Sequence, residues 1–203
     1  MSFFVPETPI ITSQIVKKSE FIGLAFCVKS RQEAMTIVAK TKAMYPQARH
    51  HCWAYSIGHP IQPIAAAMND DGEPSGTAGK PIYNVLKHSN IGHILVIVVR
   101  YFGGIKLGTG GLVRAYSSCA QATVDALSLI EYVAHVEVSI VCPFELEAQI
   151  RHTVQSLDGQ TKHTEYSNSV ALTCTLPLSA VSKLKDAYAA QQHCVVIAEN
   201  HRI

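Results

Sequence analysis

The sequence predicts an α+β protein of two domains, divided near Glu131. With 203 residues, 48% of them hydrophobic and only 16% charged, the chain is long and apolar enough for packed cores. Strand and helix patterns alternate through the first half. The second half has the order strand, helix, strand, strand, helix, strand, which is that of a ferredoxin-like fold. We therefore expect one domain over residues 1–130 and a ferredoxin-like domain over residues 131–203.

The first domain begins with two β-rich segments, residues 12–18 and 21–28, which are typical of a hairpin. Ser30 and Glu33 have the spacing of a capping box, so a helix is expected to begin there and to end at Pro46.

A half-buried strand is expected at residues 51–57. It is followed by residues 58–79, which are dense in Gly, Pro, Asp and Asn and predict a long loop. Long loops in compact domains are often functional. The remaining elements are a short helix at 81–88 with Pro81 in its first turn, a buried strand at 93–99, a glycine-rich stretch at 100–111 and a tightly packed helix at 112–129.

The second domain is expected to contain two helices among four strands. Its first helix begins after Pro143, because Leu146, Ile150 and Val154 recur at helical spacing. Ser179 is expected to cap the second helix, which runs to residue 190. The strands are expected at residues 133–141, 161–166, 169–176 and 194–198.

Composition argues against a membrane protein. The longest apolar run, residues 94–99, has six residues, and a membrane-spanning helix needs about twenty. The first residues, MSFFVPETPI, have no basic region and no long apolar stretch, which argues against a secretory signal. The six cysteines lie far apart with no Cys-x-x-Cys pair, so we expect reduced core cysteines in a cytoplasmic protein.

Basic residues are concentrated in the first domain. Residues 1–130 contain 12 Lys and Arg against 7 Asp and Glu, a net charge of +5. Residues 131–203 contain 5 against 8, a net charge of −3. The first domain is therefore the half expected to face phosphates.

The segment 69–81, NDDGEPSGTAGKP, combines three carboxylates, two hydroxyls and a lysine with three glycines and two prolines. Glycine and proline allow sharp turns that present backbone N–H groups. Carboxylates beside hydroxyls could bind a cation, or a hydroxyl could react. Three interpretations stay open: a rigid loop whose carboxylates accept its own amides, a binding surface, and a catalytic site. The residues that could contact a ligand are Asp70, Asp71, Glu73, Ser75 and Thr77.

The segment 100–114, RYFGGIKLGTGGLVR, joins a buried strand to a helix through a glycine-rich turn. Such a turn offers free amides and the positive end of a helix dipole to an anion. It lacks the P-loop pattern and the third glycine of a Rossmann fingerprint, and its glycines could instead let the helix pack close to the sheet. The residues expected to bind an anion or nucleic acid are Lys80, Arg100, Tyr101, Lys106, Gly108, Thr109, Gly110, Gly111 and Arg114, with Tyr101 and Phe102 stacking on a base.

Two adjacent histidines, His50 and His51, raise the question of a metal site. Neighbouring residues on a strand point to opposite faces, so the pair cannot easily hold one ion, and we expect a surface or edge role. The sequence has no nucleophile elbow and no zinc-protease signature. We therefore assign no catalytic residue, no metal and no cofactor.

Both glycine-rich segments resemble signatures of the IMPACT family of YigZ-like proteins. Residues 70–81 are similar to its first block and residues 98–116 to its second, and Arg-His-His-Cys at residues 49–52 fits as well. The resemblance covers roughly residues 15–128. Residues 131–203 resemble in pattern the small ferredoxin-like domain of bacterial members.

The resemblance implies an N-terminal domain with the left-handed β-α-β fold of a small-subunit ribosomal protein domain, elongation factor G domain IV and the GHMP kinases. It implies a second domain like domain V of elongation factor G. Eukaryotic relatives act in translational control, where they compete for the co-activator of a starvation-responsive initiation-factor kinase. The resemblance supplies no set of catalytic residues.

We therefore expect a non-enzymatic regulator of translation. It would bind RNA, the ribosome or a protein partner in translation through the basic, glycine-rich side of its N-terminal domain. The alternative is an enzyme that binds a small-molecule phosphate or a nucleotide with the loop from Asp70 to Lys80. A pure protein-interaction module is a third alternative.

Overall fold

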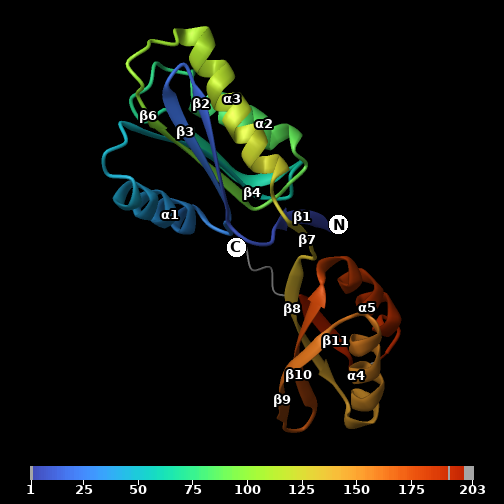
Figure 1. Cartoon of the computed structure of the whole chain (residues 1–203). Coiled ribbons are helices and arrows are strands. Elements are labelled where there is room, and N and C mark those ends of the chain that lie inside the picture. The colour runs from blue at the N-terminus through green and yellow to red at the C-terminus, as the bar shows by residue number, and fades with distance from the viewer. Residues whose placement is uncertain (1, 192, 199–203) are drawn as a thin grey trace. The chain divides into compact units, whose positions relative to one another are not determined.

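The computed structural model describes residues 2–191 and 193–198. Their contacts divide the chain into two compact units, Phe3–Tyr132 and a unit that begins at Val133. Both units contain helices and an antiparallel sheet, so this is an α+β protein in two parts (Figure 1). None of the helices in the described part of the chain is long and apolar enough to cross a membrane.

A five-stranded antiparallel sheet in the order β2-β3-β6-β4-β5 forms the centre of the N-terminal unit. Helices α2 and α3 cover one face of this sheet and helix α1 covers the other (Figure 1). The strands are β1 Phe3–Pro6, β2 Ile10–Val16, β3 Ser19–Cys27, β4 His50–Gly58, β5 Pro63–Asn69, β6 Ile94–Tyr101 and β7 Leu129–Tyr132, and the helices are α1 Arg31–Met44, α2 Gly79–His88 and α3 Thr109–Asp125.

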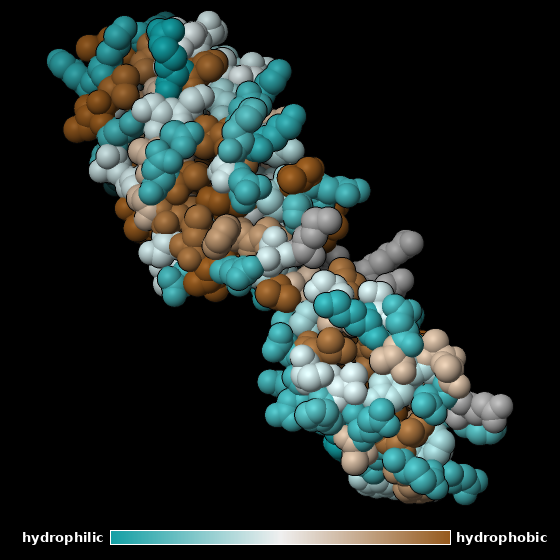
Figure 2. Space-filling view, turned by 90° about the vertical axis from the view of Figure 1, so that its right-hand side faces the viewer, coloured by the Kyte–Doolittle hydropathy of each residue, from teal (hydrophilic) through white to brown (hydrophobic). Residues whose placement is uncertain are grey.

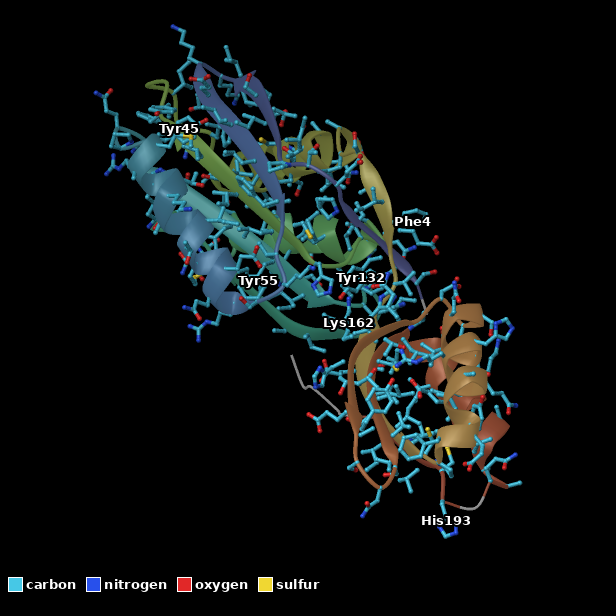
Figure 3. All side chains as sticks on the ribbon, turned by 90° about the horizontal axis from the view of Figure 1, so that it is seen from below. Phe4, Tyr45, Tyr55, Tyr132, Lys162 and His193 are labelled. Carbon is cyan, nitrogen blue, oxygen red and sulfur yellow. The ribbon has the colours of Figure 1, made fainter. Side chains whose placement is uncertain are left out.

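Strand β6 lies at the middle of the sheet and is buried on both faces. Its continuous apolar run follows from that position, because a strand covered on both sides has no face to leave polar. On the α3 side Phe21 packs edge-to-face on Tyr116, with ring centroids 5.3 Å apart. On the α1 side Tyr45 and Tyr55 join a second hydrophobic cluster (Figure 3). The helices therefore hold two cores against one sheet.

The predicted hairpin and the first helix are confirmed, with β2 paired to β3 and α1 ending just before Tyr45. Ser30 caps α1, since its Oγ accepts the Glu33 N–H at 3.1 Å. The Glu33 carboxylate accepts the N–H of Lys29 at 2.8 Å rather than that of Ser30, one residue from the usual capping box. The turn between β2 and β3 holds Lys17 and Lys18 at φ 46° and 66°.

The prediction of a loop over residues 58–79 was wrong in part, because residues 63–69 form strand β5. This strand is rich in alanine, which has a low β propensity, and its pattern alone does not reveal it. Pairing with β4 at the edge of the sheet holds it in place. Pro63 is its first residue, a position where a missing N–H is tolerated. The loop proper runs from residue 70 to residue 78.

Helix α3 begins three residues before the predicted start, so Gly110 and Gly111 lie in its first turn. It also ends earlier than predicted, because the chain leaves it for β7. Strand β7 pairs antiparallel with β1, so that Phe3 lies opposite Tyr132. Figure 3 shows Phe4 on β1 and Tyr132 on β7. Neither strand was predicted, since each has four residues and its partner lies far away in the sequence.

The C-terminal unit contains a four-stranded antiparallel sheet in the order β11-β8-β10-β9. Its core is made by residues such as Ile140, Leu172 and Ile150. Ser179 does not cap the second helix, because it lies in a short 3-10 turn and the helix follows Ala180 without a side-chain cap. The elements are β8 His135–Cys142, α4 Glu147–Ser156, β9 Gln160–Tyr166, β10 Val170–Pro177, α5 Val181–Tyr188 and β11 Val195–Ala198.

All six cysteines are free and four of them are buried, which agrees with the sequence prediction. Burial raises the pKa of the Cys119 thiol to about 12, so this thiol stays protonated at neutral pH. On the surface of both units, brown hydrophobic side chains are interrupted by teal hydrophilic ones (Figure 2). Exposed apolar side chains are common on folded proteins, because apolar atoms contribute much of the accessible surface.

Candidate anion-binding site

The loop between β6 and α3 is fixed against the turn between β2 and β3. The Gly103 N–H donates to Ser19 Oγ at 3.2 Å. A Cβ at Gly103 would lie 1.9 Å from the Lys18 carbonyl oxygen, so only glycine allows the two backbones to approach so closely. This contact brings the two lysines of the turn next to the glycine-rich segment.

The first turn of α3 has unpaired backbone N–H groups. Gly108 precedes the helix at φ 73°, a conformation that favours glycine. The first helical hydrogen bond is donated by Leu112 N–H to the Gly108 carbonyl oxygen at 2.9 Å. The three N–H groups before it, at residues 109–111, have no partner among the described residues, and no acidic residue lies in this turn. The start of α3 therefore presents free donors and the positive end of a helix dipole.

A pocket of about 390 Å³ opens at the start of α3. Two exposed cationic side chains, Arg49 and Lys106, lie on its wall. Its other lining residues are His50, Glu73, Pro74, Arg100, Phe102, Leu107, Gly108, Thr109 and Leu112. Residues from three separate parts of the chain thus meet at one concave site.

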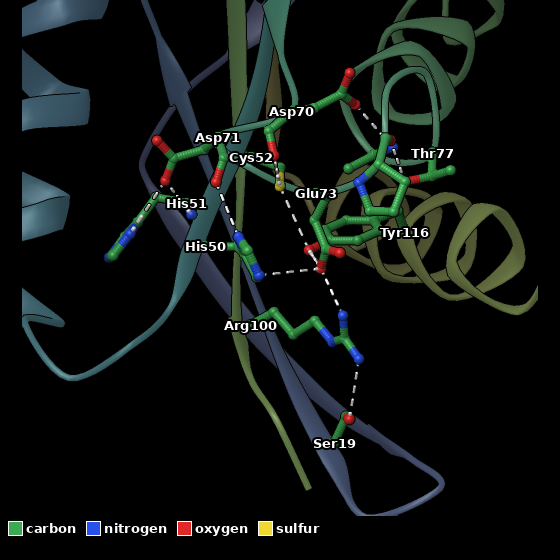
Figure 4. Close-up of polar contacts among 12 residues, drawn as sticks. Ser19, His50, His51, Cys52, Asp70, Asp71, Glu73, Thr77, Arg100 and Tyr116 are labelled. Atoms are coloured by element: carbon green, nitrogen blue, oxygen red, sulfur yellow. Dashed lines mark hydrogen bonds and ion pairs between the residues drawn. The ribbon is translucent and has the colours of Figure 1, made fainter. Parts of the chain in front are cut away.

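A buried ion pair between Glu73 and Arg100 borders this pocket (Figure 4). Arg100 Nη1 donates to Glu73 Oε1 at 2.6 Å, and the Tyr116 hydroxyl donates to the same oxygen at 2.8 Å. Arg100 is only 6% exposed and Glu73 only 8%. Burial, together with the neighbouring Cys52 and Glu73, raises the pKa of Tyr116 well above its ordinary value, so this hydroxyl remains a donor.

Glu73 leaves part of the Arg100 guanidinium unused. Only one nitrogen is paired with the carboxylate, whereas an Arg–carboxylate pair is often bidentate. Nη2 contacts Ser19 Oγ at a long 3.5 Å, and Nε is a buried nitrogen with no hydrogen-bond partner among the described residues. The guanidinium lies over the rings of Phe21 and Phe102, at 5.5 and 5.7 Å from their centroids.

The two adjacent histidines do not have the expected surface or edge role. They do point to opposite faces of β4, as predicted, but this strand is flanked by β6 and β5. His51 is buried and its Nε2 lies 3.1 Å from the Tyr45 carbonyl oxygen. His50 Nδ1 lies 2.9 Å from the Asp71 carbonyl oxygen, and its Nε2 faces Glu73 Oε1 at 3.9 Å (Figure 4). His50 therefore lies at the pocket wall.

The loop at residues 70–78 is held together by its own polar groups. The Asp70 carboxylate accepts three backbone N–H groups, those of Gly76, Ala78 and Gly79, at 2.8, 3.0 and 2.8 Å. It thereby satisfies the start of α2, as a capping residue would. The Thr77 hydroxyl donates to the Pro74 carbonyl oxygen at 2.6 Å. These bonds favour the interpretation of a rigid loop for Asp70 and Thr77.

Asp71 connects this loop to α1 and β4. Its Oδ1 lies 2.6 Å from Lys42 Nζ, and its Oδ2 accepts the His51 N–H at 2.7 Å. Partial burial acts to raise the pKa of this carboxyl, but Lys42 and the His51 N–H outweigh it and hold the pKa below its ordinary value. Asp71 is thus an ionised group with two internal partners.

A second pocket, of about 280 Å³, adjoins the first and shares Leu107 with it. Lys17 and Arg114 line this second pocket, and Lys18 follows Lys17 in the neighbouring turn. We call the exposed cationic residues around the two pockets the basic face. They are Lys17, Lys18, Arg49, Lys106 and Arg114.

The structure brings together some of the residues singled out from the sequence and separates others. Arg100, Lys106, Gly108, Thr109 and Glu73 line the first pocket, whereas Gly111 and Arg114 line the second. Lys80 lies at the start of α2, Tyr101 packs in the cluster on the α1 side, and Phe102 is the aromatic residue in the pocket. Neither pocket is lined by Gly110, Asp70, Asp71, Ser75 or Thr77.

Sequence reasoning missed Lys17, Lys18 and Arg49 as members of the site. The two lysines were assigned only to the end of the hairpin's first strand, residues 12–18. In the structure they are the central residues of the turn, an unusual position for lysine because both have positive φ. Arg49 precedes the two histidines and was included only in the resemblance. Their place in the site depends on the docking of the β2–β3 turn and of β4, which local sequence does not reveal.

Comparisons with known proteins find relatives over most of the chain. Residues 17–124 match the Impact N-terminal domain. The chain is 35% identical over 182 residues to the IMPACT family member YigZ of Escherichia coli, a match that covers 90% of this chain and 89% of the relative. It is 45% identical over 135 residues to an IMPACT family member of Haemophilus influenzae, covering 66% of this chain and 64% of that relative. A crystal structure described as that of a hypothetical protein matches with a TM-score of 0.76 and 32% identity, covering 98% of each chain.

Proposed function

Because the chain belongs to the IMPACT family, we propose that it is a non-enzymatic, RNA-associated regulator of translation that binds RNA phosphates on its basic face. The translational setting comes from what the family resemblance implies. The RNA-binding role comes from the chemistry of the site.

One observation carries this proposal: free donors and separate cations converge around the start of α3. The unpaired N–H groups of the first turn lie beside Lys106, and Arg114 projects from the same helix. Lysine and arginine side chains, backbone N–H groups and helix N-termini are the groups that contact nucleic-acid phosphates. Phe102 is 50% exposed and can stack on a base whatever its identity.

The proposal also includes the fold family of each unit. We infer that the N-terminal unit shares the left-handed β-α-β arrangement of elongation factor G domain IV. The C-terminal unit is ferredoxin-like, as its strand order β11-β8-β10-β9 supports. Shared fold by itself gives no activity, so the functional argument rests on the basic face.

The test is a charge reversal on the basic face, Lys17→Glu with Lys106→Glu and Arg114→Glu. Arg100 is left intact, since a carboxylate beside buried Glu73 would unfold the unit. We expect the triple variant to lose binding to single-stranded RNA and co-sedimentation with ribosomes. Loss of three phosphate contacts should also lower the slope of log affinity against log salt by about two.

A control triple variant carries the same change of net charge at Lys40, Lys183 and Lys185, which are exposed elsewhere. It should bind RNA nearly as the unmodified chain does. Equal loss in both triple variants, or binding that is insensitive to salt, contradicts the proposal. Binding to ribosomes that persists after nuclease treatment would favour a protein partner.

The enzyme alternative is less well supported, because the loop from Asp70 to Lys80 uses most of its polar groups internally. Asp70, Asp71, Glu73 and Thr77 all have partners within the protein. Ser75 and Lys80 are exposed, but neither lies at a pocket with the loop's carboxylates. Raised thermal stability with a nucleotide and no RNA binding would reverse this ranking.

A further inference from the structure

The pocket at the start of α3 has the size of a small-molecule site. Its volume of about 390 Å³ lies within the range of about 300 to 1,000 Å³ that such sites occupy. The pocket is therefore large enough for a compact group to enter it, in addition to phosphates that pass over the basic face.

The groups that meet in this pocket select for an anion of high charge. Arg49 and Lys106 lie on the wall, and the backbone at Gly108 and Thr109 brings the positive end of α3 to it. The one carboxylate of the lining, Glu73, has its charge compensated by Arg100. An added anion would thus meet uncompensated positive charge.

A second and independent observation comes from Arg100, which lines the same pocket and is only 6% exposed. Its Nε has no partner among the described residues, and its Nη2 has only the 3.5 Å contact with Ser19. A buried polar group without a partner is costly, and native structures usually provide one. A ligand that enters the pocket would lie beside this guanidinium, whose charge is compensated among the described residues by Glu73 alone.

The pocket also offers a flat apolar surface. Phe102 is half exposed and its ring stacks on the Arg100 guanidinium. Pro74, Leu107 and Leu112 complete the apolar part of the wall. Apolar walls with a few convergent polar groups are typical of sites for a compact ligand with an aromatic ring.

We propose that this pocket binds a nucleotide by its terminal phosphate, with the phosphate at the start of α3 and the base against Phe102. The inference rests on the proposed function, since it concerns the same face. A phosphomonoester carries up to two charges and three free oxygens, more than a phosphodiester within a strand. The phosphorylated 5′ end of an RNA and a free nucleoside monophosphate share this group.

The experiment compares two short oligouridines, labelled at the 3′ end and identical except for a 5′-phosphate or a 5′-hydroxyl. Fluorescence anisotropy with the full chain should show about tenfold tighter binding of the phosphorylated strand. Lys106→Ala should reduce that preference to about twofold or less, whereas Phe102→Ala removes a stacking contact available to both strands and should weaken both. Arg114→Ala removes the same charge outside the pocket and should weaken both strands equally, so that the preference remains. Circular dichroism checks that each variant is folded.

The two sources of the phosphate are separated by competition with uridine monophosphate. Displacement of the phosphorylated strand by the free nucleotide assigns a nucleotide site, and a lasting preference without displacement assigns the RNA end. Equal affinity for the two strands overturns the pocket assignment but leaves RNA binding by the basic face intact. A preference that falls equally in Lys106→Ala and Arg114→Ala also overturns it, because it would then reflect long-range charge alone. Failure of the chain to bind either strand overturns the proposed function instead.

Discussion

One carboxylate oxygen of Glu73 accepts hydrogen bonds from two buried donors. These donors are Arg100 on β6 and Tyr116 on α3. The loop that carries Glu73 is thereby tied to the centre of the sheet and to the helix that borders the pocket. The arginine is compensated by this single carboxylate, since the described residues give its guanidinium no other acid. The pair therefore acts as the internal support of the pocket wall.

Replacement of Glu73 by glutamine should destabilise the N-terminal unit by about 3 kcal/mol, because it leaves the Arg100 charge buried without its counter-charge. The amide keeps the size of the side chain and an acceptor for Tyr116. Urea unfolding followed by the fluorescence of Trp53, the one tryptophan of the sequence, measures the change in this unit. Glu20→Gln, at an exposed position near the start of β3, is the matched control and should stay within about 0.5 kcal/mol. A loss for Glu73→Gln no larger than that of the control contradicts the assignment.

At the scale of elements, the sequence predicted those helices and strands whose signals lie among neighbouring residues. The capping box located α1, and the apolar run located β6, because both signals depend on neighbouring residues. Strands β1, β5 and β7 were not predicted, since their stability comes from partners elsewhere in the sheet. The glycine-rich turn was identified correctly as the start of a helix. The buried ion pair of Arg100 could not be predicted, because its partner Glu73 lies in a loop 27 residues away.

The turn between β2 and β3 provides a second prediction. Lys17 and Lys18 both have positive φ, where Asn-Gly is strongly preferred, so the lysines cost stability at this position. The double variant Lys17→Asn with Lys18→Gly should stabilise the N-terminal unit by about 1 kcal/mol. It should also weaken RNA binding several-fold, because two cations of the basic face are lost.

A double glutamine variant of the same turn removes both charges without relieving the backbone. It should weaken RNA binding as much as the Asn-Gly variant does, but without the gain in stability. Thermal unfolding and RNA titration of the two variants separate the contribution of charge from that of conformation. RNA affinity unchanged in both variants would exclude the turn from the binding surface.

At the scale of the whole molecule, each unit has its own sheet and its own core. The division falls between Tyr132 and Val133, so β7 belongs to the N-terminal unit. Tyr132 packs on Phe3 and on His93, with ring centroids 5.0 and 4.9 Å apart. All residues of the basic face lie in this unit, which should therefore bind RNA without the C-terminal one.

Two truncations test this division. A chain that ends at Tyr132 should fold and bind RNA with nearly the affinity of the full chain. A chain that ends at residue 127 lacks β7 and should be less stable by about 3 kcal/mol, since Phe3 and Val5 lose the strand that covers them. Trp53 fluorescence in urea and RNA anisotropy measure both properties. Equal stability of the two fragments would show that β7 contributes nothing to the stability of the unit. Loss of RNA binding by the fragment that ends at Tyr132 would assign part of the binding site to the C-terminal unit.

The pairing of β1 with β7 has a consequence for synthesis of the chain. Phe3 leaves the ribosome well before its partner Tyr132, which is made 129 residues later. At translation rates of about 5–20 residues per second, the apolar β1 must wait roughly 6 to 26 seconds for the strand that pairs with it. During that interval β1 is an exposed hydrophobic segment that a nascent-chain chaperone can hold. The same pairing places both ends of the unit side by side, so circular permutation should be tolerated by joining them and opening an exposed turn elsewhere.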